Sequence, residues 1–167
     1  MRETNVLKYR IQDFLIDFPP FSMMNTEEIE LIMERIKLKY VEKGEVFFRQ
    51  GEEAGNFFYL VRKGAVKLER LEGGVNILVD VCGEGDLFGI RPVIANQPYL
   101  STGTAQEESI VYGVATEDIR KIMAQNPRVG SFLASSFAAG SRKDRLKDNT
   151  DGLVFISTGE VFQDEKL

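Results

Sequence analysis

The sequence predicts a mainly β, α+β fold: an antiparallel β-barrel or jelly roll flanked by N-terminal and C-terminal helices. Three observations predict this class. Over residues 38–115, short segments rich in Val, Phe, Tyr and Ile alternate with Gly-containing turns, as in KLKYV-EKG-EVFFRQ. Before and after that region, apolar residues recur at helical spacing. A hydrophobic content of 43% with twelve Phe in 167 residues supplies enough apolar surface for one core.

The chain is predicted to open with a helix over residues 1–18. Its apolar positions share one face: Leu7, Ile11, Phe14, Leu15 and Phe18. The sequence FPPF ends this helix, because proline cannot continue a helix and restricts the residue before it. We interpret this face as a packing surface, and a partner-binding role as the less favoured alternative.

A second helix is predicted to begin near Asn25. Asn25 and Glu28 have the spacing of a capping box. The residues that follow form an apolar stripe that we expect to be buried: Ile29, Ile32, Met33 and Ile36.

Glycine turns divide the barrel region into hairpins. In RKGAV, Gly64 can adopt the positive φ that a tight turn needs, and EGGVN forms the next connection. The alternation breaks after residue 85 and resumes as STGTA and SIVYGVA. A separate loop is therefore expected between two strands at this point.

Helices are predicted again over residues 116–147. Thr116 begins TEDIRKIMAQNP, which ends at Pro127. A longer helix over 128–146 carries apolar and small residues at helical spacing: Val129, Phe132, Leu133, Ser136, Phe137 and Gly140. These residues either pack on the chain's own barrel or form the seam of a homodimer, and the sequence favours the two interpretations equally.

The composition excludes several classes of function. The chain has no His and a single Cys, Cys82, so a Cys/His zinc site and the commonest general base are absent. The net charge of −5 argues against a nucleic-acid partner. The single Cys suits a reducing compartment, and no apolar run approaches the ~18 residues that span a bilayer. We expect a cytoplasmic protein that has no membrane partner, no metal and no catalytic residues.

The segment GDLFGIRPVIANQPYLSTGTA, residues 85–105, has the form of a loop that surrounds a phosphate. Glycines precede a short helical turn, and Ser and Thr lead back into a strand. Backbone N–H groups and hydroxyls could bind an anion here, although Pro92 removes one donor. The candidate ligand-binding residues are Phe88, Gly89, Ile90, Arg91, Leu100, Ser101 and Thr102.

The order of these elements resembles the cyclic nucleotide-binding domain family, which includes the bacterial catabolite activator and the regulatory subunits of protein kinase A. Three segments carry the resemblance: GEVFFRQGEEAGNFFYLVRKGAVKL, GEGDLFG and EDIRKIMAQNPRV. The resemblance implies one domain over residues 19–147, with its barrel at 38–115 and its C-terminal helices at 116–147. Residues 148–167 would be a tail or the start of a further domain.

The family's phosphate-binding loop carries a Glu that binds the ribose 2′-hydroxyl and an Arg that neutralises the cyclic phosphate. In this sequence Ile90 stands at the Glu position and, by the family spacing, Leu100 stands at the Arg position. The resemblance therefore implies a non-catalytic regulatory sensor whose binding of cAMP or cGMP is weak or lost. We interpret Arg91 as a surface residue, or as one paired with Glu84 or Asp86, and not as a substitute for the missing Arg.

Two alternatives remain open. The first is a purely structural dimerisation or interaction domain whose loop is filled by its own side chains: Leu87, Phe88, Ile90 and Leu100. A polar-lined pocket behind the loop would distinguish a sensor from such a domain. The second is a cAMP-responsive transcription regulator. It is disfavoured because a winged helix-turn-helix needs about 60–70 residues, whereas twenty follow Lys147.

A narrower resemblance concerns the segments DLFGIRP and ESIVYGV. Both resemble the N-terminal sensor domains of bacterial proteins that continue into paired CBS domains and a nucleotidyltransferase-like domain. The resemblance implies that this chain is the regulatory module of a longer signalling protein.

Overall fold

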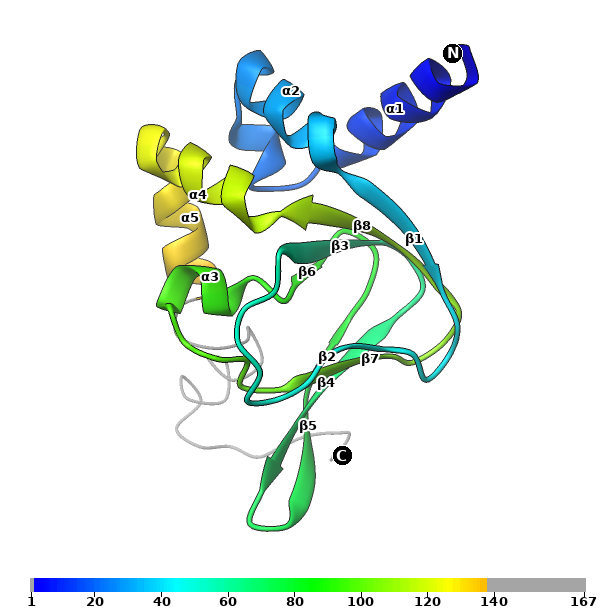
Figure 1. Cartoon of the computed structure of the whole chain (residues 1–167), viewed down its shortest axis with the longest axis vertical. Helices are drawn as coiled ribbons and strands as arrows, with labels where there is room; N and C mark the ends of the chain where they lie inside the picture. Colours follow the sequence, from blue (N-terminus) through cyan, green and yellow to red (C-terminus); the bar gives the residue numbers. More distant parts are fainter. Residues whose placement is uncertain (1, 138–167) are drawn as a thin grey trace.

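Two four-stranded antiparallel sheets face one another in the computed structural model, which describes residues 2–137 (Figure 1). The first sheet has the order β1-β8-β3-β6 and the second the order β2-β7-β4-β5. Together with the flanking helices they form the predicted α+β jelly roll. The strands are β1 (Lys37–Val41), β2 (Val46–Phe48), β3 (Phe57–Lys63), β4 (Val66–Glu72), β5 (Val75–Cys82), β6 (Leu87–Phe88), β7 (Thr102–Ala105) and β8 (Ser109–Ala115).

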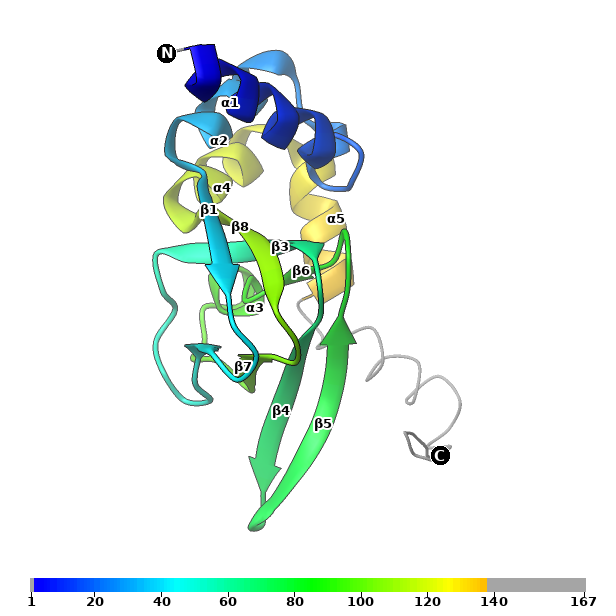
Figure 2. The same cartoon turned by 90° about the vertical axis from the view of Figure 1, so that its right-hand side faces the viewer.

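The longer helices gather at one end of the barrel, and α3 lies in the loop between β6 and β7 (Figures 1 and 2). The β4–β5 hairpin projects from the opposite end, with Gly73 and Gly74 at positive φ in its turn. The helices are α1 (Arg2–Leu15), the 3-10 turn η1 (Phe21–Met23), α2 (Thr26–Arg35), α3 (Arg91–Ala95), α4 (Thr116–Gln125) and α5 (Pro127–Phe137).

The first helix ends earlier than predicted. α1 stops at Leu15 and not at Phe18, because the chain turns before Pro19 and Phe18 therefore lies outside the helix. A Cβ added at Gly85 would collide with the Phe18 ring, so this ring packs directly on the backbone of the loop. The segment between α1 and η1 is therefore packed against the start of the predicted phosphate loop.

The predicted capping box of the second helix is confirmed. Glu28 N–H donates to Asn25 Oδ1 at 2.8 Å, and Asn25 N–H donates to Glu28 Oε1 at 3.0 Å. The Asn126 side chain also donates to Glu28 Oε1 at 2.9 Å. The cap therefore joins the start of α2 to the junction between α4 and α5.

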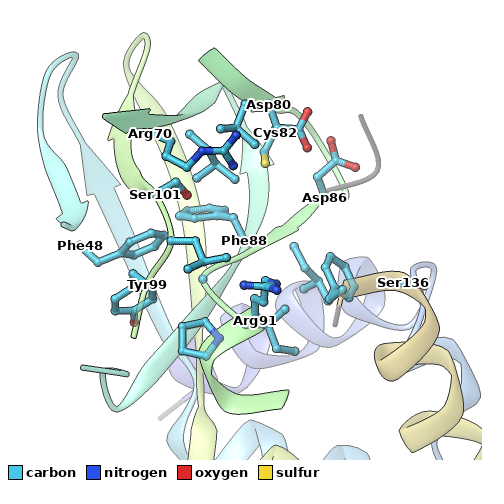
Figure 3. A pocket seen from close by; sticks show the side chains of 18 of the residues that line it. Phe48, Arg70, Asp80, Cys82, Asp86, Phe88, Arg91, Tyr99, Ser101 and Ser136 are labelled. Carbon is cyan, nitrogen blue, oxygen red and sulfur yellow. The ribbon is translucent and has the colours of Figure 1, made fainter. Parts of the chain in front are cut away.

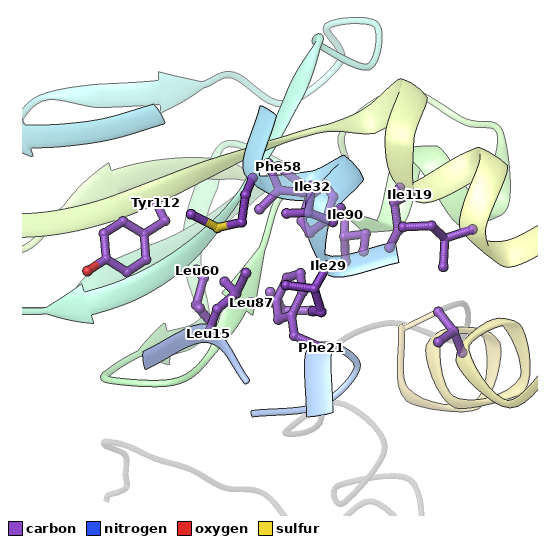
Figure 4. Close-up of a cluster of buried hydrophobic side chains, with 14 of the residues drawn as sticks. Leu15, Phe21, Ile29, Ile32, Phe58, Leu60, Leu87, Ile90, Tyr112 and Ile119 are labelled. Atoms are coloured by element: carbon purple, nitrogen blue, oxygen red, sulfur yellow. The ribbon is translucent and has the colours of Figure 1, made fainter. Parts of the chain in front are cut away.

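The hydrophobic core has two parts. The larger part lies between the first sheet and the helices, and Phe58, Leu60 and Ile90 are fully buried in it (Figure 4). The smaller part lies between the two sheets and consists of Phe48, Val61, Val66, Cys82, Phe88, Tyr99 and Val111. Along β3 the side chains alternate between the two parts, as expected for a strand that is covered on both faces.

α5 packs against its own domain. Val129 and Leu133 are fully buried in the helix-side core, so these two candidate dimer residues stabilise the single chain. Phe132, Ser136 and Phe137 are only half-buried. Gly140, the last dimer candidate, lies outside the described residues.

An ion-pair group joins α2 to the start of α4. Arg35 Nη1 lies 2.9 Å from Glu117 Oε1, and Arg35 Nη2 lies 3.6 Å from Asp118 Oδ1. The Asp118 side chain is fully buried, and neither of its oxygens accepts a hydrogen bond from any described residue. Burial raises the pKa of Asp118, and the charges of Arg35 and Lys121 oppose this only in part.

Asp118→Asn is expected to become increasingly stabilising, relative to the wild type, as pH rises. Because the pKa of Asp118 is raised in the folded state, folding favours the protonated carboxyl. The wild type therefore has its full stability below the ordinary pKa of Asp and loses part of it as pH rises through the folded-state pKa. Urea denaturation of both proteins from about pH 3 to pH 7 measures this difference.

Glu117→Gln is the matched control, and its effect on stability is expected to change with pH in the opposite direction. The hydrogen bond and charge of Arg35 lower the pKa of Glu117, so the wild type gains stability over this variant as pH rises. A difference between wild type and Asp118→Asn that stays constant with pH would show that the Asp118 carboxyl is not perturbed.

Within residues 2–137, no helix combines the length and apolar character that a bilayer crossing requires.

Candidate functional site

A pocket with a volume of about 370 Å³ opens where the predicted phosphate loop meets β4, β5 and α5 (Figure 3). Six of the seven predicted loop residues line it: Phe88, Gly89, Ile90, Arg91, Leu100 and Ser101. Thr102 does not line it. This residue begins β7, and its hydroxyl accepts a hydrogen bond from Gln50 N–H at 2.9 Å.

Short hydrogen bonds shape the loop. Gly85 N–H donates to the Val61 carbonyl at 2.8 Å, and Gly83 N–H donates to Asp86 Oδ2 at 2.9 Å. Gly89 has φ +78°, and a Cβ added there would lie 2.9 Å from the Phe48 ring. Glycine is therefore required at this position by the backbone conformation and by the aromatic ring beside it.

Neither Ile90 nor Leu100, the two residues that the resemblance places at the recognition positions, offers a polar side chain to the pocket. Ile90 is 1% exposed and packs in the helix-side core, where Figure 4 shows it among Ile32, Phe58 and Ile119. Leu100 lies at the rim and is 44% exposed. The loop is thus present as a structure, and its two expected recognition side chains are aliphatic.

An aromatic wall bounds one side of the pocket. The Phe48 and Tyr99 rings are stacked, with centroids 4.1 Å apart and planes 10° from parallel. The centroid of the Phe88 ring lies 6.2 Å from that of the Phe48 ring. Tyr99 and Phe48 are not among the site residues predicted from the sequence. The position of Tyr99, directly before the predicted ligand-binding residue Leu100, could have indicated that it lines the pocket.

Tyr99 is held by the loop before β3. Its hydroxyl accepts a hydrogen bond from Gly55 N–H at 3.0 Å. Its backbone N–H donates to the Glu52 carbonyl at 2.9 Å, and its carbonyl accepts from Gly51 N–H at 2.8 Å. Burial raises the pKa of the Tyr99 hydroxyl, so the phenol is neutral at physiological pH.

Among the described residues, four charged side chains line the pocket, and their charges balance. Arg70 and Asp80 come from β4 and β5, and Asp86 and Arg91 come from the loop (Figure 3). Arg70 Nε lies 2.6 Å from the carboxylate of Glu72, and Asp80 Oδ1 accepts from Val81 N–H at 2.8 Å. These two guanidinium and two carboxylate groups give the described part of the pocket no excess positive charge for a phosphate.

Arg91 lies in the pocket and not on the open surface, which removes the first of the two interpretations made from the sequence. It is half-buried and lines the pocket together with Asp86, one of its two predicted partners. The first turn of α3 places it there, because the helix begins at Arg91, directly after the buried Ile90. Arg70 and Asp80 also line the pocket, and they are not among the site residues predicted from the sequence.

The predicted dimer face of α5 has two different surroundings. Val129 and Leu133 are fully buried in the core, whereas Phe132, Ser136 and Phe137 are half-buried and line the pocket. The rings of Phe132 and Phe137 also pack against the edge of the core. The end of α5 therefore forms one wall of the site.

Among the described residues, no group of three or more His, Cys, Asp and Glu side chains is arranged to hold a metal ion.

Comparison with known proteins places this pocket in context. A family model described as "Cyclic nucleotide-binding domain" matches residues 38–126, more than half of the chain. The cAMP-dependent protein kinase regulatory subunit of Mycosarcoma maydis is 29% identical over 140 residues, which are 83% of this chain and 25% of that protein. The cyclic AMP receptor protein of Thermus thermophilus is 27% identical over 130 residues, which are 77% of this chain and 60% of that protein.

The fold also matches solved structures. The sensor domain of the transcriptional regulator DNR from Pseudomonas aeruginosa superimposes with a TM-score of 0.66 at 22% identity, covering 74% of this chain and 88% of that one. The chain spans a quarter to three fifths of the two sequence relatives, so their whole-protein activities are not carried over to it.

Proposed function

Because the chain belongs to the cyclic nucleotide-binding domain family, we propose that it is a non-catalytic regulatory module whose pocket binds cAMP and cGMP weakly or not at all. One observation carries this proposal. The described residues leave a pocket behind the loop, and the two residues that the resemblance aligns with the family's Glu and Arg, Ile90 and Leu100, both have aliphatic side chains. The module would therefore respond to a different small molecule or to a protein.

Simple energetics supports weak nucleotide binding. A charge-assisted hydrogen bond contributes about 1.5–3 kcal/mol, so the missing arginine weakens binding about ten- to a hundred-fold. A buried ribose hydroxyl without an acceptor costs about 1–3 kcal/mol more. The balanced charges of Arg70, Asp80, Asp86 and Arg91 do not replace the lost anchor. Together these effects move a micromolar site towards the millimolar range.

The open volume favours a ligand-binding module over a purely structural domain. Leu87 and Ile90, two of the side chains expected to fill the loop, are buried in the helix-side core, and a pocket of about 370 Å³ remains beside them. Its lining includes polar side chains such as Ser101 and Ser136. This is the pattern expected of a small-molecule site, which is mostly apolar with a few polar groups.

Homodimerisation through α5 remains part of the proposal, but fewer of the predicted residues can contribute to the interface. Since Val129 and Leu133 are buried in the core, only Phe132, Ser136 and Phe137 are available among the described candidates. The absence of nucleic-acid and membrane partners and a cytoplasmic location also remain predictions. They rest on the net charge of −5, on the single cysteine and on the lack of an apolar run of ~18 residues in the sequence.

Calorimetric titration with cAMP and with adenosine tests the proposal directly. Without an anchor for the phosphate, the wild type is expected to bind cAMP no more tightly than adenosine, which lacks the phosphate. Titration with cGMP extends the test to the second base. Saturable binding of cAMP in the micromolar range, with a clear preference over adenosine, would contradict the proposal.

Leu100→Arg is expected to tighten cAMP binding about ten- to a hundred-fold and to leave adenosine binding unchanged. Leu100 lies at the pocket rim and is 44% exposed, so a guanidinium can be accommodated without disturbing the core. Calorimetry on both ligands measures the effect. Leu71→Arg is the matched control, since Leu71 is 58% exposed and does not line the pocket. An equal effect of both substitutions would indicate non-specific attraction of the anion.

A further inference from the structure

A second hollow, of about 360 Å³, lies on the first sheet and is separate from the pocket at the loop. It is lined by residues of β1, β3 and β8: Lys37, Leu38, Lys39, Phe57, Tyr59 and Gly113. None of these residues lines the loop pocket. The Tyr59 ring connects the hollow to the inter-sheet core, because it lies 5.1 Å from Phe47 and 5.2 Å from Phe88 between ring centroids.

The strand register creates this hollow. Gly113 pairs with Lys37 on one side and with Tyr59 on the other, so the three residues form one row across β1, β8 and β3. A Cβ at Gly113 would lie 3.5 Å from the Tyr59 ring and 3.6 Å from the Phe57 ring, which are ordinary contacts. Its φ is not in the left-handed region. Neither crowding nor backbone conformation requires glycine here. Gly113 is itself buried, and its lack of a side chain leaves space beside the Phe57 and Tyr59 rings.

The hollow is cationic in a chain that is acidic overall. Lys37 Nζ lies 4.7 Å from the Phe57 ring centroid, and Lys39 Nζ lies 5.8 Å from that of Tyr59. No Asp or Glu of residues 2–137 belongs to the lining, whereas the whole chain has a net charge of −5. Ammonium groups beside aromatic faces, next to a glycine without a side chain, suit a planar molecule with a negative charge at its edge.

We propose that this hollow binds a small planar organic anion of the aryl carboxylate class. The ring of the ligand lies over Gly113 against Phe57 and Tyr59, and its carboxylate pairs with Lys37 and Lys39. The proposal does not depend on what occupies the loop pocket.

Titration with 2-naphthoate, followed by two-dimensional amide NMR of the ¹⁵N-labelled protein, tests the proposal. Saturable shifts are expected at residues 37–39, 57–59 and 113, with a dissociation constant of about 1 mM or below for a ligand of this size. The uncharged analogue 2-naphthamide is expected to bind at least about ten-fold more weakly, because it lacks the charge. Shifts confined to loop-pocket residues such as Gly89 and Ser101, or no saturable shifts, would overturn it.

Two variants separate the roles of charge and shape. Lys37→Gln with Lys39→Gln is expected to weaken 2-naphthoate binding about ten-fold, since two exposed ion pairs are lost. Gly113→Leu is expected to abolish binding by filling the space beside the two rings, and its amide spectrum checks that the fold is retained. Lys43→Gln with Lys63→Gln removes two exposed lysines outside the lining and is the matched control. Equal affinity in the two double variants would overturn the proposal.

Discussion

Ile90→Glu is expected to lower the free energy of unfolding by about 3–5 kcal/mol and to leave cyclic nucleotide binding unrestored. The substitution introduces the Glu that the resemblance implies for this position. In this chain, however, Ile90 is 1% exposed and is surrounded by the helix-side core. A carboxylate placed there would be buried without a partner. Urea denaturation at pH 7 and calorimetry with cAMP measure the two effects.

Ile90→Val is the conservative control for this prediction. It removes one methylene from the same site and is expected to cost about 0.5–1.5 kcal/mol. If Ile90→Glu cost no more than Ile90→Val and also gained cAMP binding, position 90 would face the ligand. The assignment of Ile90 to the core would then be wrong.

Phe48→Ala is expected to lower the free energy of unfolding by about 3–5 kcal/mol and to remove one wall of the loop pocket. Phe48 is 6% exposed, and its ring is stacked on Tyr99. A Cβ at either Gly89 or Gly103 would lie 2.9 Å from this ring, so the two glycine backbones pack directly against it. Loss of the Phe48 ring leaves a cavity that the surrounding backbone can fill only in part.

Phe47→Ala provides the comparison for this second prediction. Phe47 is its neighbour on β2 and is half-buried, so its truncation is expected to cost clearly less. Chemical denaturation of both variants gives the difference. Equal losses would mean that the packing of Phe48 against Tyr99 and the two glycines adds nothing beyond ordinary burial.

Local signals in the sequence were sufficient for much of the fold. The capping box of Asn25 and Glu28 and the turn glycine Gly64, at φ +104°, depend on residues within a few positions of one another. The loop at residues 85–105 was also predictable, because its glycines and its helical turn are contiguous. Each of these features is set by backbone geometry that neighbouring residues determine.

The composition of the site was less predictable, because it depends on strand register. Arg70 and Asp80 reach the same pocket from different strands of the β4–β5 hairpin. Leu68 pairs with Asp80 and Glu69 with Leu78, so Val79 forms a bulge between them. A bulge changes which side chains share a face, and simple alternation does not reveal it.

The sequence could not show which residues of α5 are buried and which line the pocket, for a related reason. Helical spacing places Val129, Phe132 and Leu133 on one broad stripe, but it does not show what covers each part. In the structure the barrel and the other helices bury Val129 and Leu133, and Phe132 faces the pocket. Tertiary contacts therefore divide a stripe that the sequence presents as one surface.

The hydrogen bonds of Tyr99 have a consequence for amide exchange. The N–H groups of Gly51 and Gly55 both donate to Tyr99, one to its carbonyl and the other to its hydroxyl. Exchange of the Gly55 proton with solvent requires the phenol to move away, and exchange of the Gly51 proton requires the backbone of residue 99 to separate from this loop. The deuterium uptake of these two glycines thus measures how often the aromatic wall opens, in a chain that has no tryptophan to report it by fluorescence.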